Sequence, residues 1–190
     1  MEMRREARQK LDAIPAQVRN RQSRALTDMI TSTEMYQDAQ YILTYLSSGN
    51  EVDTWELVRR SLKDGKKVYA PKILSEETME FYEVDDIDHL KKNKMGIYEP
   101  DESPAALFPY QIHISLDRAQ QCIMFVPGLA FDGKLRRLGR GRGYYDRYLR
   151  RLRKKMSIGL AFNEQMVQEV PADSRDETLD LIVTEQGAYF

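Results

Sequence analysis

The sequence has few of the residues on which several common chemistries depend. Cys122 is the single cysteine among 190 residues, which excludes an internal disulfide. His89 and His113 are the only histidines, and no Ser/His/Asp or clustered Cys/His arrangement is present, which argues against a triad hydrolase or a zinc site. There is no apolar run of about 20 residues and no signal-like stretch. We therefore expect a cytoplasmic protein without a membrane partner.

What the chain does contain is enough apolar sequence for one core, together with an uneven distribution of charge. With 42% hydrophobic and 31% charged residues, residues 1–190 are expected to form a single domain. The formal net charge of −1 conceals a basic segment, residues 133–155, in which eleven Lys and Arg accompany only Asp146. Its net charge is +10, and that of the remainder is −11. A basic patch on an acidic body favours one local anionic ligand over an extended nucleic-acid face.

Helical and strand patterns alternate along the chain. One helix is expected through about Leu11, and a second from Ala16, with Val18, Leu26, Met29 and Ile30 near one face. Two more are expected over 54–65, with Asp53 as N-cap, and over 144–155. Short helical turns are expected over 85–94 and 163–171, and strands over 41–49, 66–73, 78–84, 121–131 with a break at Pro127–Gly128, 156–162 and 179–185. This alternation predicts an α/β fold, a Rossmann-like three-layer domain whose mostly parallel sheet carries helices on both faces. The ligand site is expected outside the carboxyl ends of the strands.

Gly139, Gly141 and Gly143 alternate with arginines just before the last expected helix. Such a loop lets backbone N–H groups converge on an anion in front of a helix N-terminus. The spacing matches neither a Walker A loop nor a Rossmann fingerprint. From these residues alone, a phosphate cradle and a solvated Gly/Arg turn stay equally open. Asp146, in the first turn of that helix, is either a Mg²⁺ ligand beside phosphates or an acid stabilised by the helix dipole.

A longer run resembles a known family. Residues 123–149, IMFVPGLAFDGKLRRLGRGRGYYDRYL, resemble the signature of the 5-formyltetrahydrofolate cyclo-ligases, also called 5,10-methenyltetrahydrofolate synthetases. Residues 21–26, 45–54, 98–100, 159–165 and 170–185 resemble further segments of that family. The resemblance implies an ATP- and Mg²⁺-dependent enzyme that converts 5-formyltetrahydrofolate to 5,10-methenyltetrahydrofolate with release of ADP and phosphate.

The resemblance also implies roles for individual residues. The positions expected to bind ATP are Arg4, Arg137, Leu138, Gly139, Arg140, Gly141, Arg142, Gly143, Tyr144 and Asp146, with Asp146 also holding Mg²⁺. Tyr45, Glu51, Met79 and Tyr145 are expected to contact the folate, and Arg137, Arg142 and Tyr145 to act in catalysis. Two positions depart from the family pattern: its usual N-terminal lysine would precede Met1, and Met95 stands where an aromatic side chain is usual.

Two other functions stay open at the level of sequence. One is a relative of the cyclo-ligases that binds nucleotide but acts on another small molecule. The other is an RNA-binding protein that uses the basic segment, with Tyr144, Tyr145 and Tyr148 as stacking groups. For the cyclo-ligase, the expected partners are 5-formyltetrahydrofolate and ATP, with no nucleic acid, and a monomer is favoured.

Overall fold

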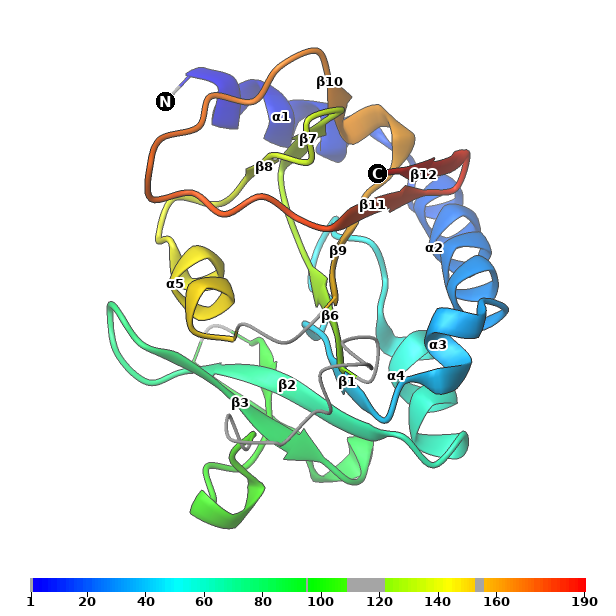
Figure 1. Ribbon diagram of the computed structural model, residues 1–190, viewed down its shortest axis with the longest axis vertical. Helices are drawn as coiled ribbons and strands as arrows, with labels where there is room; N and C mark the ends of the chain where they lie inside the picture. Colours follow the sequence, from blue (N-terminus) through cyan, green and yellow to red (C-terminus); the bar gives the residue numbers. More distant parts are fainter. Residues whose placement is uncertain (1, 95, 109–121, 153–155) are drawn as a thin grey trace.

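The computed structural model describes residues 2–94, 96–108, 122–152 and 156–190. Within these ranges the centre of the molecule is a seven-stranded sheet (Figure 1). Its strands are β1 (Tyr41–Leu43), β2 (Lys67–Ile73), β3 (Met79–Val84), β6 (Cys122–Val126), β9 (Met156–Leu160), β11 (Leu181–Thr184) and β12 (Gly187–Tyr189). Two small sheets flank it, one of β10 (Met166–Val167), β7 (Ala130–Asp132) and β8 (Arg137–Leu138), the other of β4 (Lys91–Lys92) and β5 (Tyr98–Glu99).

The strand order of the large sheet is β12-β11-β9-β6-β1-β2-β3. Strands β2, β1, β6, β9 and β11 run parallel to their neighbours, whereas β3 and β12 pair antiparallel at the two edges. The order of the parallel strands reverses between β1 and β6, because the chain goes from β1 outward to β2 and then returns to β6 on the other side. In open sheets of this kind a ligand crevice forms at that reversal. The expected α/β fold with a mostly parallel sheet is confirmed, with antiparallel edges added.

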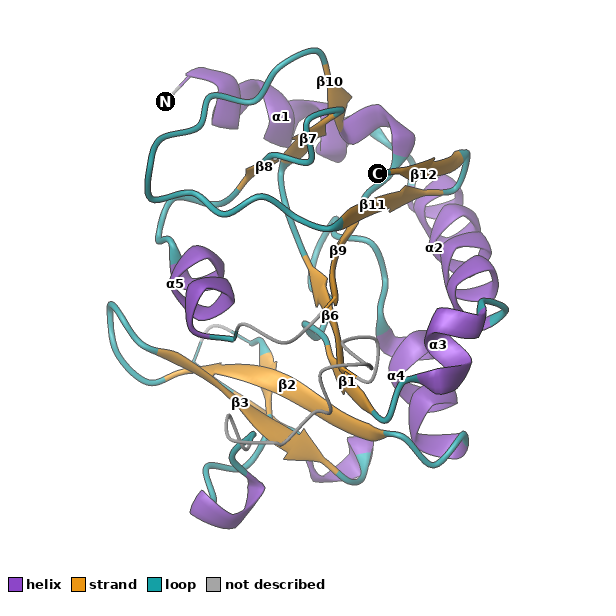
Figure 2. Cartoon of the chain, in the orientation of Figure 1, coloured by secondary structure: helices purple, strands orange, loops and turns teal. Residues whose placement is uncertain are grey.

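Helices lie on both faces of the sheet, as Figure 2 shows. Residues of α1 (Glu2–Ala13), α2 (Ala16–Thr31), α3 (Glu34–Asp38) and α4 (Trp55–Lys63) share one core, and those of α5 (Tyr144–Arg151) belong to the other. Strand β6 shows how the sheet divides them, since Ile123 and Phe125 face the first core while Met124 and Val126 face the second. All of β6 is buried, which explains why it reads as one continuous apolar run.

The structure corrects two local expectations. Helix α4 has Thr54, not Asp53, at its N-cap position, and the Thr54 hydroxyl caps no helical N–H because it donates to the Tyr45 carbonyl at 2.6 Å. Asp53 lies one residue earlier, and its carboxylate accepts the Trp55 N–H at 2.8 Å. The helical turn expected over 163–171 ends at Gln165 and continues as β10. The Gln165 side chain accepts the Phe162 N–H at 2.8 Å and donates to the Gly128 carbonyl at 2.7 Å, which holds this segment against the loop after β6.

Smaller differences concern short elements. The turn expected over 85–94 is a 3-10 turn, η1 (Ile87–His89), followed by β4, and two further 3-10 turns are η2 (Pro104–Ala106) and η4 (Asn163–Gln165). In α2, Leu26 and Ile30 are buried as expected, but Met29 is 37% exposed. None of the helices in the described ranges has the length and apolarity that crossing a membrane requires.

The hairpin that joins β7 to β8 is organised by one buried carboxylate. Asp132 accepts the N–H groups of Lys134 and Arg136 on one oxygen, and the Val170 N–H and the Arg136 guanidinium on the other. Burial alone would raise the pKa of Asp132, but these donors hold it below its ordinary value. The hairpin is therefore a fixed support for Arg137, which follows Arg136 at the start of β8.

Close packing behind this hairpin gives a stability prediction. A Cβ atom at Gly159 of β9 would lie 2.8 Å from Leu179 Cδ1 and 2.8 Å from Phe131 Cε1. Gly159→Ala should therefore overpack the core and lower the free energy of unfolding by about 1–3 kcal/mol. Denaturant titration would measure this loss. Gly133→Ala is the control, since no atom lies within 4 Å of the added methyl, and equal midpoints for the two variants would contradict the proposed packing.

Candidate active site

The predicted site residues gather where the strand order reverses. The chain leaves β1 through the loop of residues 44–54, and it leaves β6 through Pro127–Gly128 into the β7–β8 hairpin. From β8 it enters residues 139–143, called here the glycine loop, and then α5. Contacts join these segments to one another and to α1, so residues far apart in sequence form one surface.

The glycine loop has a backbone that depends on its glycines. Gly141 and Gly143 have φ angles of +104° and +66°, in the left-handed region that other residues rarely adopt. Gly143 occupies the N-cap position of α5, so the helix begins where the loop ends. Arg4 Nε donates to the Gly139 carbonyl at 3.0 Å, which ties α1 to the start of the loop. A turn of left-handed glycines before a helix N-terminus is a backbone on which N–H groups can converge on an anion.

A buried ion pair connects the two ends of the glycine loop. Arg137 Nη2 lies 2.9 Å from Asp146 Oδ2, and their side chains are only 4% and 15% exposed. The other Asp146 oxygen accepts the Glu177 N–H at 3.3 Å, and the Arg137 guanidinium stands 5.6 Å from the centre of the Tyr145 ring. Two residues predicted for different roles, phosphate binding and metal binding, are thus partners of each other.

A second ion pair connects the glycine loop to the loop after β1. Arg140 Nη2 lies 2.8 Å from Glu51 Oε1, across 89 positions of sequence. The other Glu51 oxygen accepts the Ser48 N–H at 3.0 Å, so the carboxylate is oriented from its own loop as well. Glu51 is 16% exposed, whereas Arg140 is 55% exposed. The residue predicted to bind the folate therefore touches one predicted to bind ATP.

The remaining predicted folate contacts belong to the two cores. The Tyr45 hydroxyl donates to the Val52 carbonyl at 3.0 Å, and the Tyr145 ring makes an edge contact with Phe81. Burial raises the pKa of both tyrosines well above the ordinary value, so both hydroxyls keep their protons at neutral pH. Met79 is 5% exposed and lies in the same core as Phe81.

The other predicted ATP contacts differ in exposure. Leu138 is buried and its carbonyl accepts the Leu129 N–H at 2.7 Å, which ties the start of the glycine loop to the segment after β6. The Tyr144 hydroxyl donates to the Ser75 carbonyl at 3.0 Å. Arg142 is exposed and makes no ion pair with any residue that the structure describes. Met95 lies outside the described residues.

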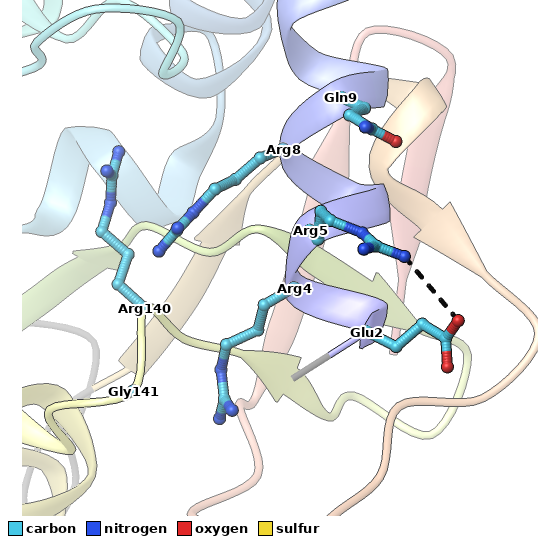
Figure 3. A pocket seen from close by; sticks show the side chains of 7 residues that line it. All are labelled: Glu2, Arg4, Arg5, Arg8, Gln9, Arg140 and Gly141. Carbon is cyan, nitrogen blue, oxygen red and sulfur yellow. Dashed lines mark ion pairs between the residues drawn. The ribbon is translucent and has the colours of Figure 1, made fainter.

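A pocket of about 770 Å³ opens between α1 and the glycine loop (Figure 3). It is lined by Glu2, Arg4, Arg5, Arg8, Gln9, Arg140 and Gly141. Glu2, Arg8 and Gln9 were not predicted from the sequence. The available signal was the spacing of Arg4 and Arg8, since residues four apart on a helix share one face.

Among the described residues, the candidate site offers a metal ion few protein ligands. No group of three or more His, Cys, Asp or Glu that could hold an ion occurs among them. Mg²⁺ is commonly bound by one or two carboxylates while phosphates and waters supply its other ligands. Asp146 beside the glycine loop fits that pattern, and a metal held by protein groups alone does not.

Comparison with known proteins decides the family. Residues 1–185 match the profile of the 5-formyltetrahydrofolate cyclo-ligases. The chain belongs to the 5-formyltetrahydrofolate cyclo-ligase family. The resemblance seen in the sequence is thereby confirmed, and so is the enzyme class.

Relatives and a solved structure agree with this assignment over nearly the whole chain. The 5-formyltetrahydrofolate cyclo-ligase of Mus musculus is 31% identical, with 97% of this chain and 93% of the mouse protein covered. That of Escherichia coli K12 is 30% identical over 90% of this chain and 91% of its own. The solution structure of the Aquifex aeolicus 5,10-methenyltetrahydrofolate synthetase superposes with a TM-score of 0.82 at 28% identity, covering 99% of this chain and 90% of that one.

The buried ion pair gives a second stability prediction. Arg137→Met keeps the apolar stem but leaves the Asp146 carboxylate without its cation, so the free energy of unfolding should fall by about 2–4 kcal/mol. The matched control is Arg175→Met, since Arg175 pairs with Asp173 at the same 2.9 Å but the two side chains are 83% and 53% exposed. That variant should leave the denaturant midpoint almost unchanged, because an exposed ion pair contributes little to stability. Equal losses in denaturant titrations of the two variants would show that the Arg137 pair is not a structural anchor.

Proposed function

We propose that the protein uses ATP and Mg²⁺ to close the ring of 5-formyltetrahydrofolate. Family membership supports 5-formyltetrahydrofolate cyclo-ligase activity. In the proposed reaction the formyl oxygen attacks the γ-phosphorus of ATP and ADP leaves. N10 of the folate then attacks the activated formyl carbon, the N10 proton passes to the phosphate or to solvent, and cleavage of the C–O bond releases phosphate to give 5,10-methenyltetrahydrofolate. The oxygen of the formyl group therefore ends in the released phosphate.

The contact between Arg140 and Glu51 carries the proposal. It brings the candidate phosphate loop and the candidate folate carboxylate within 2.8 Å of each other. A reaction between a formyl oxygen and a terminal phosphate needs such proximity of two substrate sites, because positioning supplies much of the rate in phosphoryl transfer.

The proposed roles follow from the exposure and charge of each group. The triphosphate would lie on the amides of the glycine loop, with exposed Arg142 and Arg140 spreading positive charge over its oxygens. Glu51 would accept hydrogen bonds from the amino and ring N–H groups of the pterin. The neutral Tyr145 hydroxyl can donate a hydrogen bond to an oxygen that gains charge during transfer. Tyr45 and Met79 would form an apolar wall against the folate.

Asp146 is the group proposed to hold Mg²⁺ together with the nucleotide. The ion would neutralise phosphate charge when bound. Arg137 keeps the Asp146 carboxylate in place at the first turn of α5. Arg137 is thus proposed to act on the phosphates partly through Asp146, as well as by its own charge.

The oligomeric state, the compartment and the partners are also proposed. We infer a monomer acting in the cytoplasm on 5-formyltetrahydrofolate and ATP, without nucleic acid. One relative, from Arabidopsis thaliana, is named as mitochondrial, so family membership alone does not determine the compartment.

The described contacts give less support to RNA binding. Many cations of the basic segment are paired with carboxylates, as in Arg136 with Asp132, Arg150 with Glu177 and Arg151 with Glu80. Of the three tyrosines considered as stacking groups, Tyr148 is 1% exposed and belongs to the core. A relative that acts on a different small molecule would share this site, and only an assay separates it from a cyclo-ligase.

Two substitutions test the proposal through separate substrates. The intact protein should form 5,10-methenyltetrahydrofolate, followed by its ultraviolet absorbance, only when ATP, Mg²⁺ and 5-formyltetrahydrofolate are all present. Hydrogen bonds to charged groups are worth about 1.5–3 kcal/mol, so Glu51→Gln should raise the KM for the folate by roughly 10- to 100-fold. Asp146→Asn should instead raise the Mg²⁺ concentration needed for half-maximal rate by about tenfold or more.

Controls separate lost function from lost structure. Lys63→Gln removes a charge at the exposed end of α4 and should leave both constants unchanged. Thermal unfolding of each variant shows whether Asp146→Asn acts by weakening its pair with Arg137. Binding of ATP without any turnover of the folate would contradict the cyclo-ligase and favour a relative with another substrate.

A further inference from the structure

The pocket between α1 and the glycine loop is walled mainly by guanidinium groups. Arg4, Arg5 and Arg8 line it from α1 and Arg140 from the glycine loop, with Arg5 directed toward Glu2 and Arg8 toward Arg140 (Figure 3). The described residues that line it include no aromatic or aliphatic side chain. An adenine ring would meet only the aliphatic stems of the arginines there, whereas an anion would meet four guanidinium groups against the single carboxylate of Glu2. The pocket therefore suits the phosphate end of a nucleotide.

Arg8 is the arginine of this pocket without an acceptor among the described residues. Arg4 donates to the Gly139 carbonyl, Arg140 pairs with Glu51, and Arg5 lies 3.8 Å from Glu2. No hydrogen bond or ion pair joins Arg8 to any part of the chain that the structure describes. In Figure 3 its side chain extends from α1 toward Arg140 rather than toward Glu2. Two cations that face each other repel, and an anion between them would reverse the sign of that interaction.

The position of Arg8 relative to the glycine loop determines what it would contact. Gly141 lines the pocket, so the loop that would carry the phosphates forms part of its wall. If the inner phosphates of a nucleotide lie on the loop amides, the outermost phosphate is the next group beyond the loop. That group could extend into the pocket toward Arg8. A planar guanidinium can bind that group through two parallel hydrogen bonds.

We propose that Arg8 binds the outermost phosphate of ATP and makes the site prefer a nucleoside triphosphate over the diphosphate. This proposal rests on the proposed function, since it assumes that the glycine loop carries the nucleotide. It adds a specificity residue outside the loop and outside the positions implied by the family resemblance. A diphosphate on the same loop ends one group short and leaves Arg8 without a partner, which favours release of ADP after the reaction.

The test measures Mg²⁺-nucleotide binding by calorimetry on the full chain without folate. Arg8→Gln keeps much of the side-chain length but removes the charge. A charged hydrogen bond is worth about 1.5–3 kcal/mol, so the Kd for ATP should rise by roughly 10-fold or more, while that for ADP changes by less than about twofold. The ratio of the two dissociation constants should therefore fall toward one. Arg8→Lys, which restores a point charge, should recover part of the preference.

A matched control lies on the same helix. Lys10 is exposed and does not line the pocket, so Lys10→Gln removes one positive charge from α1 and should leave both dissociation constants unchanged. Inorganic triphosphate and pyrophosphate provide a second arm, because Arg8→Gln should weaken the former more than the latter if the contact is to phosphate.

The outcomes that overturn the proposal are distinct. Equal weakening of ATP and ADP, or no weakening, would remove Arg8 from the outermost phosphate and leave the proposed function intact. Unchanged nucleotide binding together with weaker binding of 5-formyltetrahydrofolate, titrated separately, would show that the pocket receives the folate's glutamate carboxylates instead. Failure of the unsubstituted protein to bind ATP at all would overturn both this proposal and the proposed function.

Discussion

The buried ion pair between Arg137 and Asp146 is the constraint on which the candidate active site depends. One partner lies on β8 and the other in the first turn of α5, so the pair joins the two ends of the glycine loop. A loop with left-handed glycines has many accessible conformations when its ends are free. With both ends held, and with Arg4 donating to Gly139, the backbone of the glycine loop is restricted to a narrow set of arrangements.

The supports behind this pair extend into the fold. Asp132 fixes the hairpin that carries Arg137, and Phe131 of the same hairpin packs in the core against the sheet. The reversal of strand order between β1 and β6 then places the loop of Glu51 beside the glycine loop. Electrostatic contacts at the surface thus depend on hydrophobic packing beneath it, and the site is assembled from segments that are remote in sequence.

The sequence indicated those parts of the structure whose pattern is local. The apolar run of β6, its break at Pro127–Gly128 and the glycine loop before α5 could all be predicted, because each reflects the preferences of neighbouring residues. The Thr54 cap and the β10 segment could not, since Tyr45 and Gly128 hold them through tertiary hydrogen bonds. The Arg140–Glu51 contact and the position of Arg8 likewise depend on how distant segments meet.

Ionic strength acts differently on the two kinds of charge in this site. At physiological salt the Debye length is about 8 Å, so dissolved ions screen exposed side chains such as Arg142 and Arg8. The Arg137–Asp146 pair, with its arginine only 4% exposed, is shielded from those ions by the protein itself. Added salt therefore weakens the long-range attraction of an anionic ligand while the anchor of the glycine loop persists. As the salt concentration rises, long-range attraction by the exposed arginines should weaken before the conformation of the glycine loop changes.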